Sequence, residues 1–154
     1  MSDGTISYGQ EDGSLASTNY ESPVSAIEKI PSADTKFAVG FQDGDIRHLK
    51  LDIENFSLVV GDRMLDSKSA NAGIVEILFG DFDGDGDMEL GVLRQDNRFQ
   101  VWQLMQNQPL LRYESKQADN LGNIVGIHPL KAKNRHDVLM LNYTGWIYSL
   151  ITDR

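Results

Sequence analysis

The sequence predicts an all-β chain made of four-stranded antiparallel sheets, and two observations carry this prediction. A tight turn with Gly or Asn in its second position, followed two residues later by Ile or Phe, occurs four times, at residues 3–6, 43–46, 96–99 and 144–147. The last three copies each follow an apolar run, at residues 37–42, 90–95 and 138–143. Because Gly and Asn accept the positive φ that a tight turn requires, turns of this kind between apolar runs predict β-hairpins.

The spacing of these hairpins predicts how the strands are grouped. The Gly or Asn of the four turns stands at residues 4, 44, 97 and 145, so neighbouring turns are 40, 53 and 48 residues apart. Periods of this size fit one β-propeller blade, which has four strands. We therefore expect each blade to run from an innermost strand through a second and a third strand to an outer strand.

On this register the chain holds about three blades' worth of strands. The expected segments, in chain order, are a half blade (1–22), a complete blade (24–64), a complete blade with an acidic loop (74–115) and an incomplete blade (124–151). Short apolar runs at 24–30, 74–79 and 124–127 are expected to be innermost strands. More polar runs at 15–20, 57–60 and 110–114 suit outer strands with one wet edge. Polar, turn-rich linkers lie at residues 66–73 and 116–123.

The competing interpretation is a mixed α/β domain with helices at residues 24–30 or 98–106. Those stretches are short and rich in Phe, Val, Ile and Trp, which favours strands. The expected core consists of Val39, Ile77, Phe79, Val92, Phe99, Trp102, Met140 and Ile147.

An acidic loop between two expected strands is the strongest candidate for a site. Its acidic residues stand at every second position and are Asp81, Asp83, Asp85, Asp87 and Glu89. This spacing lets short carboxylates converge on one hard cation, and Ca²⁺ accepts six to eight oxygen ligands. The loop begins like the helix–loop–helix calcium motif, but Val92 stands where that motif needs a bidentate Glu. Apolar runs flank the loop on both sides, so it is predicted to be the tip of a β-hairpin.

Residues 80–102 resemble the FG-GAP-type repeat of β-propellers. Such repeats occur in integrin α-subunit head domains and in intracellular propellers of the BBSome and of KICSTOR-linked FG-GAP proteins. The resemblance implies a calcium ion held by the side chains of Asp81, Asp83, Asp85 and Glu89 and by the backbone carbonyl of Asp87. The corresponding loops at 31–36 and 131–137 lack a carboxylate cluster, so one metal site is expected.

Composition excludes several classes of function. The net charge is −9, which argues against a nucleic-acid backbone or an anionic membrane surface as partner. No cysteine is present, so disulfides, zinc–thiolate sites and cysteine nucleophiles are excluded. No apolar run approaches the roughly 18 residues of a membrane span. The sequence shows no export signal, so a cytoplasmic location is expected, with an extracellular one left open.

No catalytic motif is visible, so the expected function is a non-enzymatic protein-interaction or scaffold role within a larger assembly. Two alternatives remain open: an extracellular FG-GAP adhesion or glycan-binding module, and part of a propeller hydrolase. A closed propeller needs at least four blades, so the chain is expected to belong to a longer propeller or to be completed by another chain. One form of completion is a homodimer in which residues 15–20 of one copy pair beside residues 146–151 of the other.

Overall fold

The fold is all-β, as the sequence predicts. The computed structural model describes residues 4–65, 72–105, 108–115, 124–131, 134, 136–142 and 147–150. This part of the chain contains thirteen strands and no helix, and hence no helix able to cross a membrane. The chain divides into two compact units, Met1–Ile74 and Val75–Arg154, which are described separately below.

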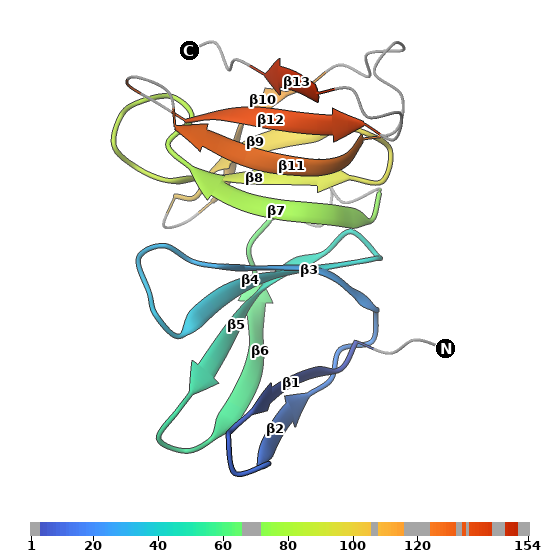
Figure 1. Cartoon of the computed structure of the whole chain (residues 1–154), viewed down its shortest axis with the longest axis vertical. Helices are drawn as coiled ribbons and strands as arrows, with labels where there is room; N and C mark the ends of the chain where they lie inside the picture. The colour runs from blue at the N-terminus through green and yellow to red at the C-terminus, as the bar shows by residue number, and fades with distance from the viewer. Residues whose placement is uncertain are drawn as a thin grey trace. The chain divides into compact units, whose positions relative to one another are not determined.

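The first unit contains a two-stranded and a four-stranded sheet (Figure 1). The small sheet pairs β1 (Ile6–Gly9) with β2 (Leu15–Thr18) in antiparallel register. The larger sheet has the order β3 (Val24–Lys29), β4 (Lys36–Phe41), β5 (Ile46–Asp52) and β6 (Ser57–Arg63). The β4–β5 turn uses Gly44 with φ of 90°, a conformation that glycine adopts at little cost. This is one of the turns that the sequence predicts.

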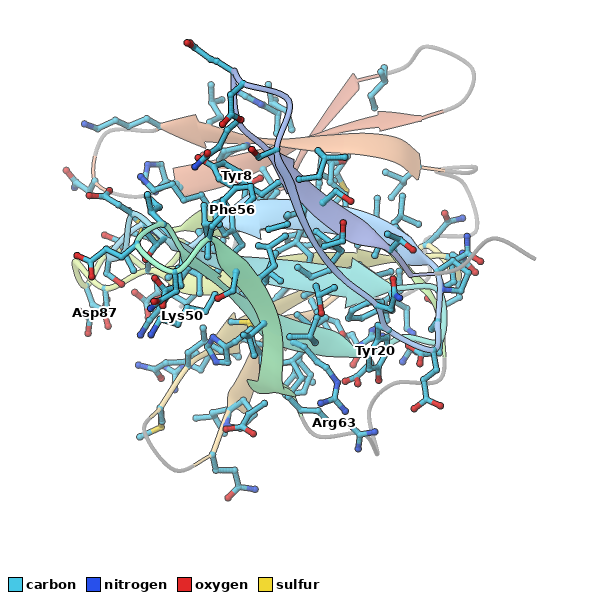
Figure 2. The ribbon with its side chains drawn as sticks, turned by 90° about the horizontal axis from the view of Figure 1, so that it is seen from below. Tyr8, Tyr20, Lys50, Phe56, Arg63 and Asp87 are labelled. Carbon is cyan, nitrogen blue, oxygen red and sulfur yellow. The ribbon has the colours of Figure 1, made fainter. Side chains whose placement is uncertain are left out.

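The core of the first unit lies between its two sheets. Its buried members are Val39, Phe41, Leu49 and Leu58, and Ile6 and Tyr8 from β1 pack against them. Tyr8 contacts Phe56 with ring centroids 5.8 Å apart (Figure 2). The buried carboxylate of Asp45 accepts hydrogen bonds from the Tyr20 hydroxyl at 2.8 Å, Arg47 Nε at 2.8 Å and Arg63 Nε at 3.2 Å. This network fixes the end of the small hairpin to the larger sheet.

The second unit contains a four-stranded and a three-stranded sheet (Figure 1). The four-stranded sheet has the order β10 (Leu110–Glu114), β9 (Phe99–Gln103), β8 (Glu89–Arg94) and β7 (Ile74–Gly80). The three-stranded sheet consists of β11 (Ile124–Lys131), β12 (His136–Asn142) and β13 (Ile147–Leu150). Both larger sheets of the protein are thus four-stranded and antiparallel, as predicted, and the described strands form no closed ring.

The two sheets of the second unit share one hydrophobic core. Its buried members include Leu78 and Leu93 from the four-stranded sheet and Ile127 and Met140 from the three-stranded sheet. Two hydrogen bonds reinforce the contact: Ile127 N donates to Glu76 Oε2 at 2.9 Å, and Ile124 N donates to Asn97 Oδ1 at 3.1 Å. The second unit is therefore held together by apolar packing and by side chains that accept from backbone amides.

Most of the predicted core is buried. The predicted residues that are buried are Val39, Ile77, Val92, Phe99, Trp102 and Met140. The prediction for Phe79 is wrong, because this side chain is only partly buried. Side chains alternate between the faces of a strand, so Phe79 shares a face of β7 with Ile77, which is buried, and the exposure of Phe79 arises near the end of the strand. The side chain of Ile147 lies outside the described part of the structure.

Candidate metal centre

The acidic loop, residues 81–88, connects β7 to β8 and is wrapped around its own carboxylates. Asp81 accepts hydrogen bonds from the Gly84 and Gly86 amides at 2.7 and 3.0 Å. Asp83 accepts from the Asp85 amide at 3.0 Å, and Asp85 accepts from the Asp87 amide at 2.9 Å. Gly84 and Gly86 have φ of 82° and 97°, which L side chains rarely adopt. The alternation of Asp and Gly thus lets the backbone turn inward while the carboxylates point to one place.

Four of the five predicted residues are brought together. One oxygen from each of Asp81, Asp83, Asp85 and Glu89 lies within 4.8 Å of the others. The carboxylate of Asp87 does not belong to this cluster. The resemblance assigns only its backbone carbonyl to the metal, and that role stays a prediction.

Glu89 is the buried member of the cluster. It is 1% exposed, and its Oε2 accepts a hydrogen bond from the Phe82 amide at 2.8 Å. Its other oxygen, Oε1, is buried and has no hydrogen-bond partner among the described residues. The pKa of Glu89 is raised to about 7: burial is the largest cause, the hydrogen bond from the Phe82 amide opposes it, and the charges of the three aspartates add to the rise. A buried carboxylate oxygen without a partner costs free energy, which a bound cation would recover.

The chemistry of the donor set fits calcium. All four side chains offer carboxylate oxygen, the ligand that hard cations prefer, and neither nitrogen nor sulfur is present in the cluster. Structural zinc sites, by contrast, are built mainly from cysteine and histidine. Calcium takes six to eight oxygens, so backbone carbonyls and water would complete its coordination.

His136 supports the loop from the neighbouring sheet, a role that sequence reasoning missed. The Asp81 amide donates to His136 Nδ1 at 2.8 Å, and the His136 amide donates to the Asp81 carbonyl at 2.7 Å. The sequence places His136 in a loop at 131–137, whereas the structure makes it the first residue of β12. The only sequence signal is its place just before an apolar run, since the group that it contacts is a backbone amide far away in the chain.

The corresponding connections in the other sheets carry no such cluster where they are described. In the β3–β4 connection, the Ile30 amide donates to the Lys36 carbonyl at 3.0 Å, and Lys29 pairs with Asp34 at 3.2 Å on the surface. In the β11–β12 connection, residues 132, 133 and 135 lie outside the described part. Among the described residues, the cluster at Asp81 to Glu89 is the one group of three or more His, Cys, Asp or Glu side chains placed to hold a metal.

Comparison with known proteins identifies no family. No protein-family model matches the chain, and no curated protein matches it. Among solved structures, the chain is similar to the crystal structure of Raptor from Chaetomium thermophilum, with a TM-score of 0.47 and 16% sequence identity. The match covers 92% of this chain and 13% of the Raptor chain, so this chain spans a small part of that protein's length. The resemblance to FG-GAP-type repeats stays a prediction.

Proposed function

We propose that this chain is a non-enzymatic β-propeller segment that serves protein interaction and binds one structural Ca²⁺ in its β7–β8 loop. One observation carries the metal site: four carboxylates converge within 4.8 Å, and the buried Oε1 of Glu89 has no hydrogen-bond partner among the described residues. The ligands would be the side chains of Asp81, Asp83, Asp85 and Glu89, with the backbone carbonyl of Asp87 added by the FG-GAP resemblance.

The ion would act as a structural clamp. Carboxylates at this spacing repel one another, and the repulsion is strongest at the buried Glu89, where water screens it least. A divalent cation replaces that repulsion by attraction. Because Asp81 follows the last residue of β7 and Glu89 is the first residue of β8, the same ion would join the two strand ends.

The interaction role is proposed because the sequence shows no catalytic motif and because the resemblance to FG-GAP-type propellers implies a subunit of a larger assembly. We place the chain in a larger cytoplasmic assembly with other protein subunits. A homodimer that completes a propeller ring is one form of such an assembly. Of its predicted edge at residues 146–151, residues 147–150 form β13, and residues 146 and 151 lie outside the described part of the structure.

Calcium binding is tested by calorimetric titration and by thermal melting in EDTA and in millimolar calcium. A ligand that binds only the folded state stabilises it by about 2.7 kcal/mol at one hundred times Kd. For a chain of this length that corresponds to a rise in Tm of about 5–10 °C. Asp83→Asn should lose most of the binding heat and most of the rise in Tm.

Asp87→Asn is the matched control, since it makes the same substitution in the same loop but removes an exposed carboxylate outside the cluster, and it should keep both signals. Equal melting temperatures in EDTA and in calcium, without binding heat, would reject the metal site. Specific binding on a glycan array would replace the protein-interaction role by a glycan-binding one.

A further inference from the structure

A groove with both polar and apolar lining residues lies beside the metal loop in the second unit. Its volume is about 740 Å³, and its apolar lining comes from Leu104, Met105, Pro109 and Leu110, at the end of β9 and the start of β10. Met105 is 58% exposed and Leu110 is 44% exposed. A groove of this volume falls within the range of about 300–1,000 Å³ that is typical of ligand pockets.

The exposed apolar side chains of this groove call for an occupant. Large aliphatic side chains that gather on a surface are typical of interaction sites, because covering each one releases water from apolar surface. Methionine adapts its shape to the group that it contacts, and Met105 is the most exposed of the apolar residues that line the groove. The groove is therefore suited to receive an apolar side chain of another molecule.

The charge beside the groove selects among apolar occupants. Among the described residues that line the groove, Asp87 is the one that is charged, and Figure 2 shows its side chain pointing away from the ribbon. Asp87 is exposed, and its carboxylate has no hydrogen-bond or ion-pair partner among the described residues. The neighbouring carboxylates of the metal loop add negative potential. A basic side chain would complement this rim.

We propose that this groove binds a segment of a partner protein in which an apolar side chain stands next to Lys or Arg. The proposal rests on the interaction role proposed above and names the chemistry of the partner. The apolar side chain would enter between Met105 and Leu110, and the basic group would pair with Asp87. The two glutamines in the lining, Gln103 and Gln108, can bond to the backbone of the bound segment.

Other occupants fit the groove less well. A glycan stacks on exposed aromatic rings, but no aromatic residue lines this groove. Trp102, which stands nearby in β9, is 5% exposed, and its Nε1 donates to Gln100 Oε1 at 3.2 Å. At this acidic rim, a second copy of a chain with net charge −9 offers poorer charge complementarity than a basic segment does, and so does an anionic membrane surface.

The test begins with selection of displayed random short peptides on the native protein in calcium. We expect the enriched peptides to share an apolar residue beside Lys or Arg. Fluorescence polarisation then compares binding of an enriched peptide to the wild type and to two variants, Leu110→Ser and Asp87→Lys. Each variant should weaken binding by about tenfold or more, because one hot-spot contact commonly contributes that much.

The controls are Leu15→Ser, which changes a leucine that is 69% exposed in the first unit, and Glu11→Lys, which reverses an exposed charge there. Both should bind the peptide like the wild type. Asp87→Lys should in turn prefer a peptide in which the basic residue is replaced by Glu. This reversal would be absent if Asp87 acted only on the structure of the loop.

Four outcomes would overturn the proposal. The first two are that no peptide is enriched and that the enriched peptides are acidic. The third is that Leu110→Ser binds the peptide as tightly as the wild type, in which case the interaction site lies at another surface. A wild-type dimer that Leu110→Ser abolishes in light scattering would assign the groove to a second copy. Failed calcium binding with intact groove binding would reject the metal site alone, so the two proposals fail separately.

Discussion

The β3–β4 connection and the β7–β8 connection take the same place in their sheets, but different groups close them. Backbone atoms close the first, through the hydrogen bond from the Ile30 amide to the Lys36 carbonyl. Side-chain carboxylates close the second, since the amides of residues 84–87 all donate hydrogen bonds to aspartate oxygens. A backbone closure tolerates many sequences, whereas a carboxylate closure accumulates negative charge that a bound cation, or a proton on Glu89, relieves.

The turn that follows the second strand allows the two sheets to be aligned residue by residue. The Phe41 amide bonds to the Asp45 carbonyl at 3.0 Å, and the Arg94 amide bonds to the Arg98 carbonyl at 2.9 Å. When Phe41 is aligned with Arg94, Lys36 is aligned with Glu89, and each of these two is the first residue of the second strand of its sheet. Lys36 is exposed and Glu89 is buried. Charge and burial at one shared position therefore separate a plain hairpin from a candidate metal site.

The largest expected effect concerns what the two sheets share. Val39 and Val92 occupy the same aligned position, and both are fully buried. Val92→Asp would bury an unpaired charge and should lower the free energy of unfolding by about 4 kcal/mol or more, measured by urea denaturation. Val39→Asp should do the same in the first unit. Val59→Asp, at a position that is 55% exposed, is the control, and a Val92→Asp protein with the wild-type midpoint would show that the strand register is wrong.

The next effect depends on what the sheets do not share, the buried carboxylate. In calcium-free protein the pKa of Glu89 is raised from 4.5 to about 7 by burial and by the neighbouring aspartates. Between about pH 4.5 and 7, Glu89 therefore keeps its proton in the folded state but loses it in the unfolded state. This contribution to stability is fully present below about pH 4.5 and is lost as the pH rises through about 7, on the order of 3 kcal/mol in all.

Glu89→Gln should therefore melt above the wild type in EDTA at about pH 8 and below it in calcium, where the ligand is missing. Thermal melts of both proteins between about pH 5 and 8 measure this crossing. Glu54→Gln, which changes an exposed carboxylate in the first unit, should follow the wild type under all conditions. Parallel pH curves for wild type and Glu89→Gln in EDTA would contradict the role given to burial.

A smaller effect is expected for the hydrogen bond by which His136 supports the metal loop. His136→Ala removes the acceptor of the Asp81 amide and should cost about 1–3 kcal/mol, because this part-buried donor loses its partner. His136→Asn, which keeps a side-chain acceptor, should recover part of the loss. His128→Ala, at an exposed position in the same sheet, is the control for chemical denaturation. Equal unfolding midpoints for His136→Ala and His128→Ala would show that the hydrogen bond from the Asp81 amide to His136 does not contribute to stability.

The smallest effect compares two glycines with positive φ. Gly86 has φ of 97° and Gly13 has φ of 88°, and an added Cβ would meet no atom within 4 Å at either position. Alanine at each should therefore cost only the backbone strain, about 1–2 kcal/mol. In calcium the deficit of Gly86→Ala should grow, while that of Gly13→Ala should not change. Melting curves of both variants with and without calcium measure these deficits. An equal deficit of Gly86→Ala in the two conditions would show that the backbone conformation of Gly86 does not affect metal binding.

The hairpins and the acidic loop were predictable because their signals are local. Gly44 and Asn97 mark turns through a requirement on their own φ, and alternating acids mark a loop through short-range spacing. His136 and Phe79 were not predictable in the same way. The contact of His136 with the Asp81 amide and the partial exposure of Phe79 depend on which segments pack against β7 and its loop, and those segments lie far away in the chain.

The bonds from the four-stranded sheet to β11 and β12 also bear on the order in which the second unit folds. They join residues separated by 27, 51 and 55 positions, and the longest connects Asp81 to His136. Contacts of such separation form late, because a long stretch of chain must first be closed into a loop. During synthesis the acidic hairpin therefore emerges well before His136, which accepts the hydrogen bond from the Asp81 amide. Calcium bound by the neighbouring carboxylates would hold the hairpin in shape during that interval, so the ion would act as a folding aid as well as a clamp.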